Sequence, residues 1–225
     1  MDAKEIIARR VAFELHDRTL VNLGIGLPTL VASYVPPGIR VAFQSENGIV
    51  GFGARPPEGM EDPYLTDAGG SFVSALPGAW SFDSVTSFAL IRGGHLDMTV
   101  LGGLQVDAGG RLANWMVPGR MVAGMGGAMD LVAGARRVVV AMQHTARGEP
   151  KIVRELSLPA TAVRRVTLVV TDMAVIEPTK DGLVLRERAP GVTVAAILAV
   201  TGAALRVEGS VPEMRLGAAS PAPAD

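Results

Sequence analysis

The 225-residue sequence contains no cysteine, which excludes disulfide bonds and metal sites built from thiolates. Aromatic residues make up only 4% of the chain, while apolar residues of all kinds make up 48%. The core must therefore consist mainly of aliphatic side chains, which is typical of a parallel β-sheet covered by helices. The absence of cysteine also fits a reducing compartment, and we expect a cytoplasmic protein.

The chain also lacks net charge and long hydrophobic runs. Its 21 Lys and Arg residues are balanced by 22 Asp and Glu residues, which gives a formal charge of −1. No overall field attracts nucleic acid or an anionic membrane, so we expect neither as a partner. The longest candidate membrane segment, residues 192–205, is shorter than the roughly 18 residues needed to span a bilayer. The amino-terminal residues do not predict a secretory signal.

Several common functional motifs are missing as well. The histidines at 16, 95 and 144 have no metal-ligand spacing, so we predict no metal site and a structural or solvated role for each. His95, which follows two glycines, is kept as a possible neighbour of a site. Residues 24–26 lack the third glycine of a dinucleotide-binding loop, and residues 124–127 are not followed by the Lys-Ser or Lys-Thr of a P-loop. No Gly-x-Ser-x-Gly elbow of a serine hydrolase is present.

Strand and helix patterns alternate along the chain, which predicts an α/β fold with an open, mainly parallel sheet flanked by helices. We predict one domain over residues 1–208 and a disordered tail over 209–225. A long loop is predicted over residues 54–70, which are rich in Pro, Gly, Glu and Asp. The predicted helices cover residues 3–16, 28–34, 81–91, 128–133 and 193–201, and the predicted strands cover 19–23, 40–44, 97–101, 137–143, 166–171 and 183–187.

What the sequence does contain is a carboxylate set among glycines at the end of a predicted strand. The run QSENGIVGFG occupies residues 44–53 and places Glu46 where an apolar strand stops. Ligand crevices of open α/β sheets lie at the carboxyl ends of the strands, and glycines there let a ligand approach the backbone closely. Glu46 is therefore the first candidate for chemistry, as a general base, a general acid or a nucleophile. An exposed glutamate in a turn is the alternative interpretation.

Several motifs together resemble the B subunit of the family I CoA-transferases. They are NLGIGLPTLVASYVP at 22–36, QSENGIVGFG at 44–53, SFALIRGGHLDMTVLGGLQVD at 87–107, LANWMVPGRMVAGMGGAMDLVAGARRVVVAMQHTA at 112–146 and APGVTV at 189–194. The resemblance runs from about residue 4 to residue 203 and is most similar to the 3-oxoacid (succinyl-CoA) transferases, which include acetoacetate and 3-oxoadipate enzymes. It implies the CoA-transferase fold and coenzyme A as a substrate, with no tightly bound cofactor. The implied partner is the A-type subunit of a CoA-transferase, in an A2B2 heterotetramer.

The resemblance also assigns roles to residues. In that family the glutamate of the Ser-Glu-Asn-Gly motif is the nucleophile, which implies that Glu46 forms a mixed anhydride and then a glutamyl-CoA thioester. Asn47 and Gly48 would shape the turn that presents Glu46, and Gly102 and Gly103 would supply backbone donors for the oxyanion. The residues expected along the bound CoA are Gly24, Gly26, Gly51, Gly53, Gly124, Gly126 and Gly127.

Two positions depart from the family pattern. Gly103 replaces a residue that is commonly alanine, which leaves the backbone donor available and loosens the loop. Gly70 stands where many relatives carry a lysine that could meet a CoA phosphate, so Arg55, Arg92 or Arg120 would have to compensate, or CoA would bind less tightly.

Two alternatives to CoA transfer stay open from the sequence. The same scaffold could hydrolyse or cleave a CoA ester with Glu46 as a base, or the chain could be a non-catalytic partner in the assembly. Release of free CoA without an acceptor acid would identify the first, and absence of turnover with the A-type subunit would identify the second.

Overall fold

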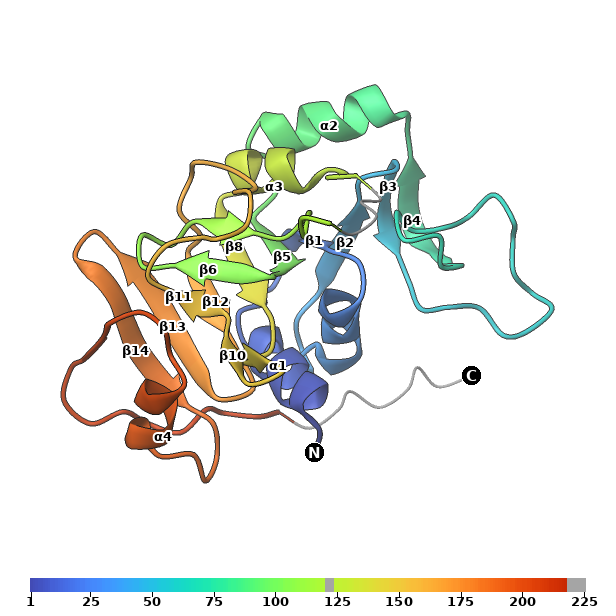
Figure 1. Cartoon of the computed structure of the whole chain (residues 1–225). Helices are drawn as coiled ribbons and strands as arrows, with labels where there is room; N and C mark the ends of the chain where they lie inside the picture. The colour runs from blue at the N-terminus through green and yellow to red at the C-terminus, as the bar shows by residue number, and fades with distance from the viewer. Residues whose placement is uncertain (120–123, 218–225) are drawn as a thin grey trace.

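The computed structural model describes residues 1–119 and 124–217 and has a large sheet at its centre (Figure 1). Five strands are parallel to one another: β1 (Thr19–Leu23), β2 (Val41–Ser45), β5 (Met98–Gly102), β8 (Arg137–Ala141) and β12 (Leu168–Val170). The strand order is β15-β14-β13-β12-β8-β5-β1-β2-β3-β4, so β1 lies between β2 and β5. The predicted α/β fold with a mainly parallel sheet is confirmed.

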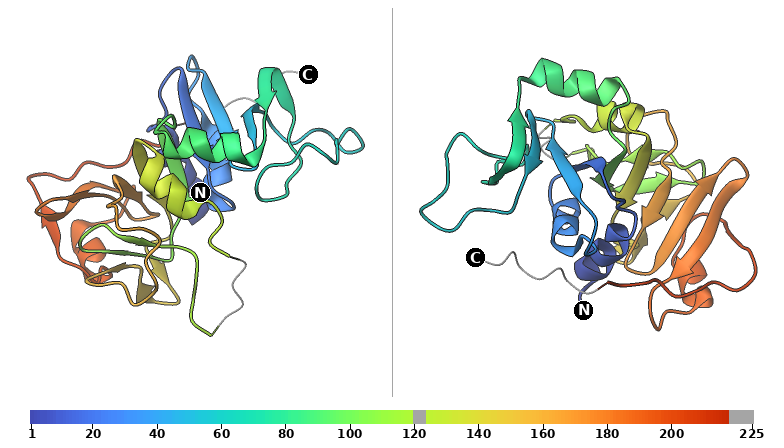
Figure 2. Two further views of the ribbon diagram at one scale, coloured as in Figure 1. Left: turned by 90° about the horizontal axis from the view of Figure 1, so that it is seen from above. Right: turned by 180° about the vertical axis from the view of Figure 1, so that it is seen from behind.

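Further strands extend both edges of this sheet. One edge carries β3 (Ile49–Phe52) and β4 (Ala75–Ser81), which both pair antiparallel to the preceding strand. The other edge carries the antiparallel strands β13 (Ala174–Thr179) and β14 (Gly182–Arg188), followed by β15 (Leu205–Val207), which is parallel to β14. A small sheet is formed by β6 (Gln105–Asp107), β7 (Leu112–Ala113) and β11 (Ile152–Val153), and β9 (Thr145–Ala146) pairs with β10 (Glu149–Pro150). The long loop between β3 and β4 extends away from the sheet (Figures 1 and 2).

Helices cover both faces of the sheet, as the aliphatic composition predicts (Figure 2). The helix α1 (Ala3–Ala12) and the 3₁₀ helix η1 (Leu27–Tyr34) pack together on one face, and α2 (Ser84–Arg92) and α3 (Ala128–Gly134) pack together on the other. Successive side chains of a strand point to opposite faces. Val139 accordingly joins the core under α1, while Val138 and Val140 join the core that contains α2, α3 and α4 (Val194–Ala199). None of the described helices is long and apolar enough to cross a membrane.

The structure departs from the predicted elements in several places. The helix expected over 3–16 ends at Ala12, because the next residues form tighter bonds to carbonyls three positions back. The sequence does not predict the strands β3, β4, β13 and β15 of the main sheet or the short strands β6, β7, β9, β10 and β11. The helix expected over 28–34 is a 3₁₀ helix, and the helix expected over 81–91 begins at Ser84, because Ser81 is the last residue of β4. Residues 209–217, expected to belong to the disordered tail, pack against the domain: Met214 is buried and donates its N–H to the Arg188 carbonyl. Residues 218–225 lie outside the described residues.

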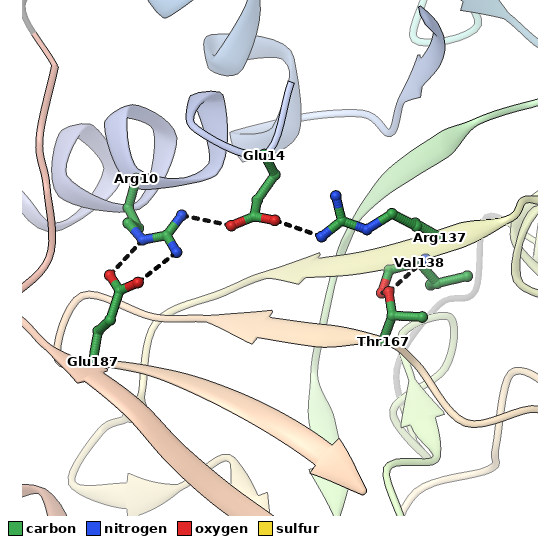
Figure 3. A network of polar contacts seen from close by, with 6 residues as sticks. All are labelled: Arg10, Glu14, Arg137, Val138, Thr167 and Glu187. Carbon is green, nitrogen blue, oxygen red and sulfur yellow. Dashed lines mark hydrogen bonds and ion pairs between the residues drawn. The ribbon is translucent and has the colours of Figure 1, made fainter. Parts of the chain in front are cut away.

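A network of ion pairs ties α1 to two strands of the sheet (Figure 3). Arg10 forms a bidentate pair with Glu187 of β14, with N···O distances of 2.6 and 2.8 Å. The carboxylate of Glu14 bridges Arg10 and Arg137, the first residue of β8. The side chain of Arg10 is almost fully buried, so the charges that surround it are needed to compensate for its loss of hydration.

This network makes stability depend on pH. Burial alone would raise the pKa of the Glu14 carboxyl, but hydrogen bonds from Arg137 and Arg10 outweigh it and lower the pKa below its ordinary value. The unfolded chain then binds more protons, so this stabilisation is present above the unfolded pKa and is lost as the pH falls through the lowered one. We expect Glu14→Gln to lose about 1–3 kcal/mol at neutral pH and to show a weaker acid dependence of urea unfolding.

The matched control is Glu177→Gln, which removes the partner of Arg186 in a largely exposed pair. We expect this change to cost less than about 1 kcal/mol. Equal pH dependence of unfolding in the wild type and Glu14→Gln, measured between about pH 7 and about pH 3, would show that Glu14 does not carry the effect.

Candidate active site

Glu46 lies in the tight turn between β2 and β3, at the edge of the sheet where the parallel strands β1, β2 and β5 all end. Its side chain is half-buried, which contradicts the alternative of a fully exposed turn glutamate. The register pairs Asn22 of β1 with both Gln44 of β2 and Thr99 of β5. Glu46, two residues beyond Gln44, therefore projects from the same face of the sheet as these polar side chains, toward α2 and α3.

A buried amide holds the Glu46 carboxylate. Asn22 is fully buried, and its Nδ2 lies 3.2 Å from Glu46 Oε2 and 2.9 Å from Gln44 Oε1. The Asn22 Oδ1 accepts a bond from the Thr99 hydroxyl, and Gln44 Nε2 donates to Ser87 of α2 at 2.9 Å. Because every one of these amides is bonded, the network fixes the direction in which the carboxylate points.

A glycine lies close to the other oxygen of the carboxylate. A methyl group added at Gly127, just before α3, would lie 3.4 Å from Glu46 Oε1 and 3.4 Å from Phe88 Cζ. Gly127, predicted along the bound CoA, is thus brought directly against the candidate nucleophile. Gly124 and Gly126 precede it with positive φ angles and open space around them. The carboxylate consequently lies beside a fixed amide on β1 and close to the backbone of Gly127.

The predicted turn residues hold the Glu46 turn in place. Gly48 has a φ of +121°, and a Cβ there would come within 2.0 Å of the Phe82 carbonyl oxygen. Asn47 donates from Nδ2 to the Thr66 carbonyl at 2.6 Å, and the Ser45 hydroxyl accepts the Ala68 N–H at 2.8 Å. The long loop, residues 53–74, is therefore bound to the turn that carries Glu46 at two points.

The two glycines predicted as oxyanion donors lie at the end of β5, separated from β2 by β1 alone. Space around the Gly102 Cα is open, with no atom within 4 Å of an added methyl group. A methyl group at Gly103 would approach Met142 Sδ and Val140 Cγ1 to 2.8 Å. These side chains pack around Gly103 and leave no room for a methyl group. Their packing opposes the loop flexibility that was expected from glycine in place of alanine.

Packing accounts for most of the remaining predicted glycines. Gly24 donates its N–H to the Val100 carbonyl, which an added methyl would approach to 3.0 Å. Gly51 and Gly53 pack closely against β4 or the residue before it, where methyl groups would lie 3.1 Å from Ala79 Cα and 2.7 Å from Ser74 Oγ. Gly26 is exposed, precedes η1 with a φ of +86° and has open space around it. Their contact with CoA stays a prediction.

A cavity of about 280 Å³ opens on the opposite face of the same strand ends. Leu23, Ser45 and Phe52 line it, together with Gly26 and Asp67. Leu23 and Ser45 alternate along their strands with Asn22 and Gln44, so the cavity and the Glu46 carboxylate lie on different faces of the sheet. Glu46 is not among the described residues that line this cavity.

Other candidate groups are placed away from Glu46 or already paired. The His95 suggestion is wrong, because this exposed residue precedes β5 and so lies at the opposite edge of the sheet. His144 is structural: its ring is buried and bonds to Thr171 and Thr201, and burial lowers its pKa. Arg92 pairs with Asp130, and Arg55 lies near Glu61. Arg120 lies outside the described residues. No group of three His, Asp or Glu suited to a metal is found in the described ranges.

Comparison with known proteins identifies the class of this fold and site. The coenzyme A transferase family model matches residues 4–199. The beta subunit of the acetate CoA-transferase of Haemophilus influenzae is 51% identical over 96% of this chain and 97% of its own length. The B subunit of a probable succinyl-CoA:3-ketoacid coenzyme A transferase of Bacillus subtilis is 47% identical over 93% of this chain and 98% of its own length.

A solved structure agrees at the level of the fold. The apoenzyme of an acyl-CoA transferase from Escherichia coli O157:H7 superposes with a TM-score of 0.74 at 22% identity, over 95% of this chain and 43% of that longer chain. The chain belongs to the coenzyme A transferase family. Within it, the chain matches the B-type subunits of family I, which confirms the resemblance found from the motifs.

The sequence points to Glu46 but not to the residues that orient it. Asn22, Gln44 and Thr99 are polar residues inside otherwise apolar strands, at equivalent depths in three neighbouring strands. A buried polar residue requires a hydrogen-bond partner. Three such residues before glycine-rich strand ends are a signal that could have predicted a polar network under the carboxylate.

Proposed function

We propose that this chain is the catalytic B subunit of a CoA-transferase that moves CoA between succinyl-CoA or acetyl-CoA and a 3-oxoacid such as acetoacetate or 3-oxoadipate. Glu46 is the nucleophile, and a glutamyl-CoA thioester is the intermediate. The observation that carries the proposal is the position of the Glu46 carboxylate beside the Asn22 amide and close to the Gly127 backbone, at the carboxyl edge of the sheet.

The first half of the reaction loads CoA onto the enzyme. A Glu46 carboxylate oxygen attacks the thioester carbonyl of the acyl-CoA, and the carbon–sulfur bond breaks to give a mixed anhydride and CoA thiolate. The thiolate then attacks the glutamyl carbonyl, which releases the donor acid as its carboxylate and leaves the glutamyl-CoA thioester. Covalent capture divides one difficult exchange into steps between acyl groups of similar activation.

The second half reverses these steps with another acid. The acceptor carboxylate attacks the glutamyl thioester to form a new anhydride and free thiolate, and the thiolate attacks the acceptor acyl carbon to restore Glu46. Water must be kept from both intermediates, because hydrolysis would lose the activated bond. The half-buried position of Glu46, packed against Gly127, is suited to this requirement.

Each attack creates an oxyanion that needs donors already in place. The candidates are the backbone N–H groups of Gly102 and Gly103, at the end of β5. This strand is the neighbour of β1, and Asn22 of β1 donates to the Glu46 carboxylate. Asn47 and Gly48 hold the turn. The remaining predicted glycines, above all Gly126 and Gly127, would border the CoA chain.

The partner in this proposal is the A-type subunit of a CoA-transferase, and the assembly is an A2B2 heterotetramer with the active site at the contact between unlike subunits. The B-type character of the relatives supports a second kind of subunit, and this chain in isolation should be inactive. Relatives named for acetate and for 3-ketoacids support small carboxylic acids as substrates. For two acids that differ by a methylene group, the free energies of transition-state binding differ by only about 1–3 kcal/mol. A panel of acids is therefore needed to identify the substrate.

The test is covalent capture in the complex of this chain with the A-type subunit. We expect that incubation with succinyl-CoA or acetyl-CoA, without acceptor acid, followed by hydroxylamine, converts Glu46 to a hydroxamate that peptide mass spectrometry locates. Exposed Glu58 of the long loop is the internal control and should stay unmodified.

Two results would contradict the proposal. One is a wild-type complex that transfers CoA without any modification at Glu46. The other is continuous release of free CoA without an acceptor, which would indicate ester hydrolysis.

A further inference from the structure

A lysine that no motif points to contacts the predicted oxyanion loop. Lys151 lies between β10 and β11, far in sequence from the end of β5, and its Nζ donates to the Gly103 carbonyl at 2.7 Å. It is one of three lysines in the chain, with Lys4 and Lys180. A buried or half-buried ammonium is costly unless its donors are used, and here one is used on a main-chain carbonyl of the site.

The charge of Lys151 is not consumed by a salt bridge. Among the ion pairs between described residues, none includes Lys151. The charged group that acts on its ammonium is Asp172, whose carboxylate accepts the backbone N–H of His144. The backbone N–H of Lys151 donates to the His144 carbonyl. Burial lowers the pKa of Lys151, and the charge of Asp172 partly offsets this.

Two hydrogen bonds hold the peptide group between Gly103 and Leu104, in the loop after β5. The Gly103 carbonyl is held by Lys151, and the N–H of the next residue, Leu104, donates to the Ala113 carbonyl at 2.9 Å. On the preceding side, Gly102 is paired with Ala141 of β8. A glycine pair has wide conformational freedom, and these contacts remove it.

We propose that Lys151 is a positioning residue for CoA transfer, whose ammonium holds the Gly103 carbonyl so that the Gly102–Gly103 backbone presents its N–H groups to the oxyanion beside Glu46. This inference rests on the proposed function. Preorganised donors are effective only within a few tenths of an ångström of their correct position, and a flexible glycine pair supplies that precision only when it is held.

The experiment compares Lys151→Met and Lys180→Met in the complex with the A-type subunit. Methionine retains an unbranched apolar chain without the ammonium, and Lys180 is an exposed lysine far along the sequence, in the turn between β13 and β14. We expect Lys151→Met to lower kcat by about 10²-fold, with KM for acyl-CoA changed less than about threefold, because binding is retained while oxyanion stabilisation is lost. Lys180→Met should match the wild type in both.

The pH profile separates positioning from a role in folding alone. We expect kcat of the wild type to fall on the alkaline side as Lys151 loses its proton. Lys151→Arg, which stays charged, should recover part of kcat and move this alkaline limb to higher pH. Thermal unfolding of every variant shows whether a decrease in kcat is caused by a smaller fraction of folded protein.

Unchanged kcat in folded Lys151→Met would overturn the inference, as would an alkaline limb that is the same in the wild type and Lys151→Arg. Either result would leave the proposed function intact, provided that the wild type forms the Glu46 thioester in the same assay. A wild-type complex that forms no thioester would overturn the proposed function and the role of Lys151 together.

Discussion

Replacing Glu46 with alanine is expected to lower kcat for CoA transfer by about 10⁴-fold or more, because the reaction then has no group that can hold the acyl and CoA moieties covalently. The loss should appear in each half-reaction and not only in the complete exchange. Binding of acyl-CoA should change little, since Glu46 acts at the reacting carbonyl. The measurement is steady-state turnover and single-turnover acid release, made on the complex with the A-type subunit.

Two further variants test the position of the carboxylate and serve as a control for the Glu46→Ala result. Glu46→Asp keeps the carboxylate but shortens its reach by one methylene, and a displacement of about 1 Å is expected to cost about 10²-fold. Glu58→Gln removes a carboxylate from the exposed part of the long loop and should leave turnover unchanged. Retained turnover in Glu46→Ala, with purity established by mass spectrometry, would remove Glu46 from the chemistry.

The central fold could be predicted from the sequence because its strands obey simple rules. Strands buried on both faces appear as short apolar runs, and β1, β5, β8 and β12 all begin within two residues of their predicted starts. Strand β4 could not be found in this way. It is an exposed edge strand that contains Pro77 and Gly78, both of which argue against a strand when only the sequence is read.

The residues of the candidate site also differ in whether the sequence could predict them. Glu46, Gly48 and Gly127 could be predicted, and the structure brings the carboxylate of the first against the backbone of the third. The sequence marks Asn22 as a polar residue in an apolar strand, but its contact with Glu46, and that of Lys151 with Gly103, could not be predicted, because these contacts join residues 24 and 48 positions apart. Pairing of that kind depends on strand order, and strand order does not follow from the local pattern of any one strand.

The turn that presents Glu46 is expected to tolerate no side chain at Gly48. Alanine there would have to adopt a φ near +121°, which is unfavourable for any residue with a Cβ, and the new methyl group would lie 2.0 Å from the Phe82 carbonyl oxygen. Because the clash is with backbone, relief requires β3 and the residues before α2 to separate, and this breaks the bond from the Phe82 N–H to the Gly48 carbonyl. We expect Gly48→Ala to lose about 3 kcal/mol or more of unfolding free energy.

Gly78→Ala is the matched control, because it places the same methyl group in the adjacent strand at a φ of +87° with no atom within 4 Å. It has the backbone strain without the clash, so we expect a loss of only about 1–2 kcal/mol. Urea unfolding measures both, and the difference between the two variants isolates the close approach of Phe82. Equal losses would mean that the hairpin moves aside at no cost. In that case the Glu46 turn would be held mainly by its bonds to the long loop through Asn47 and Ser45.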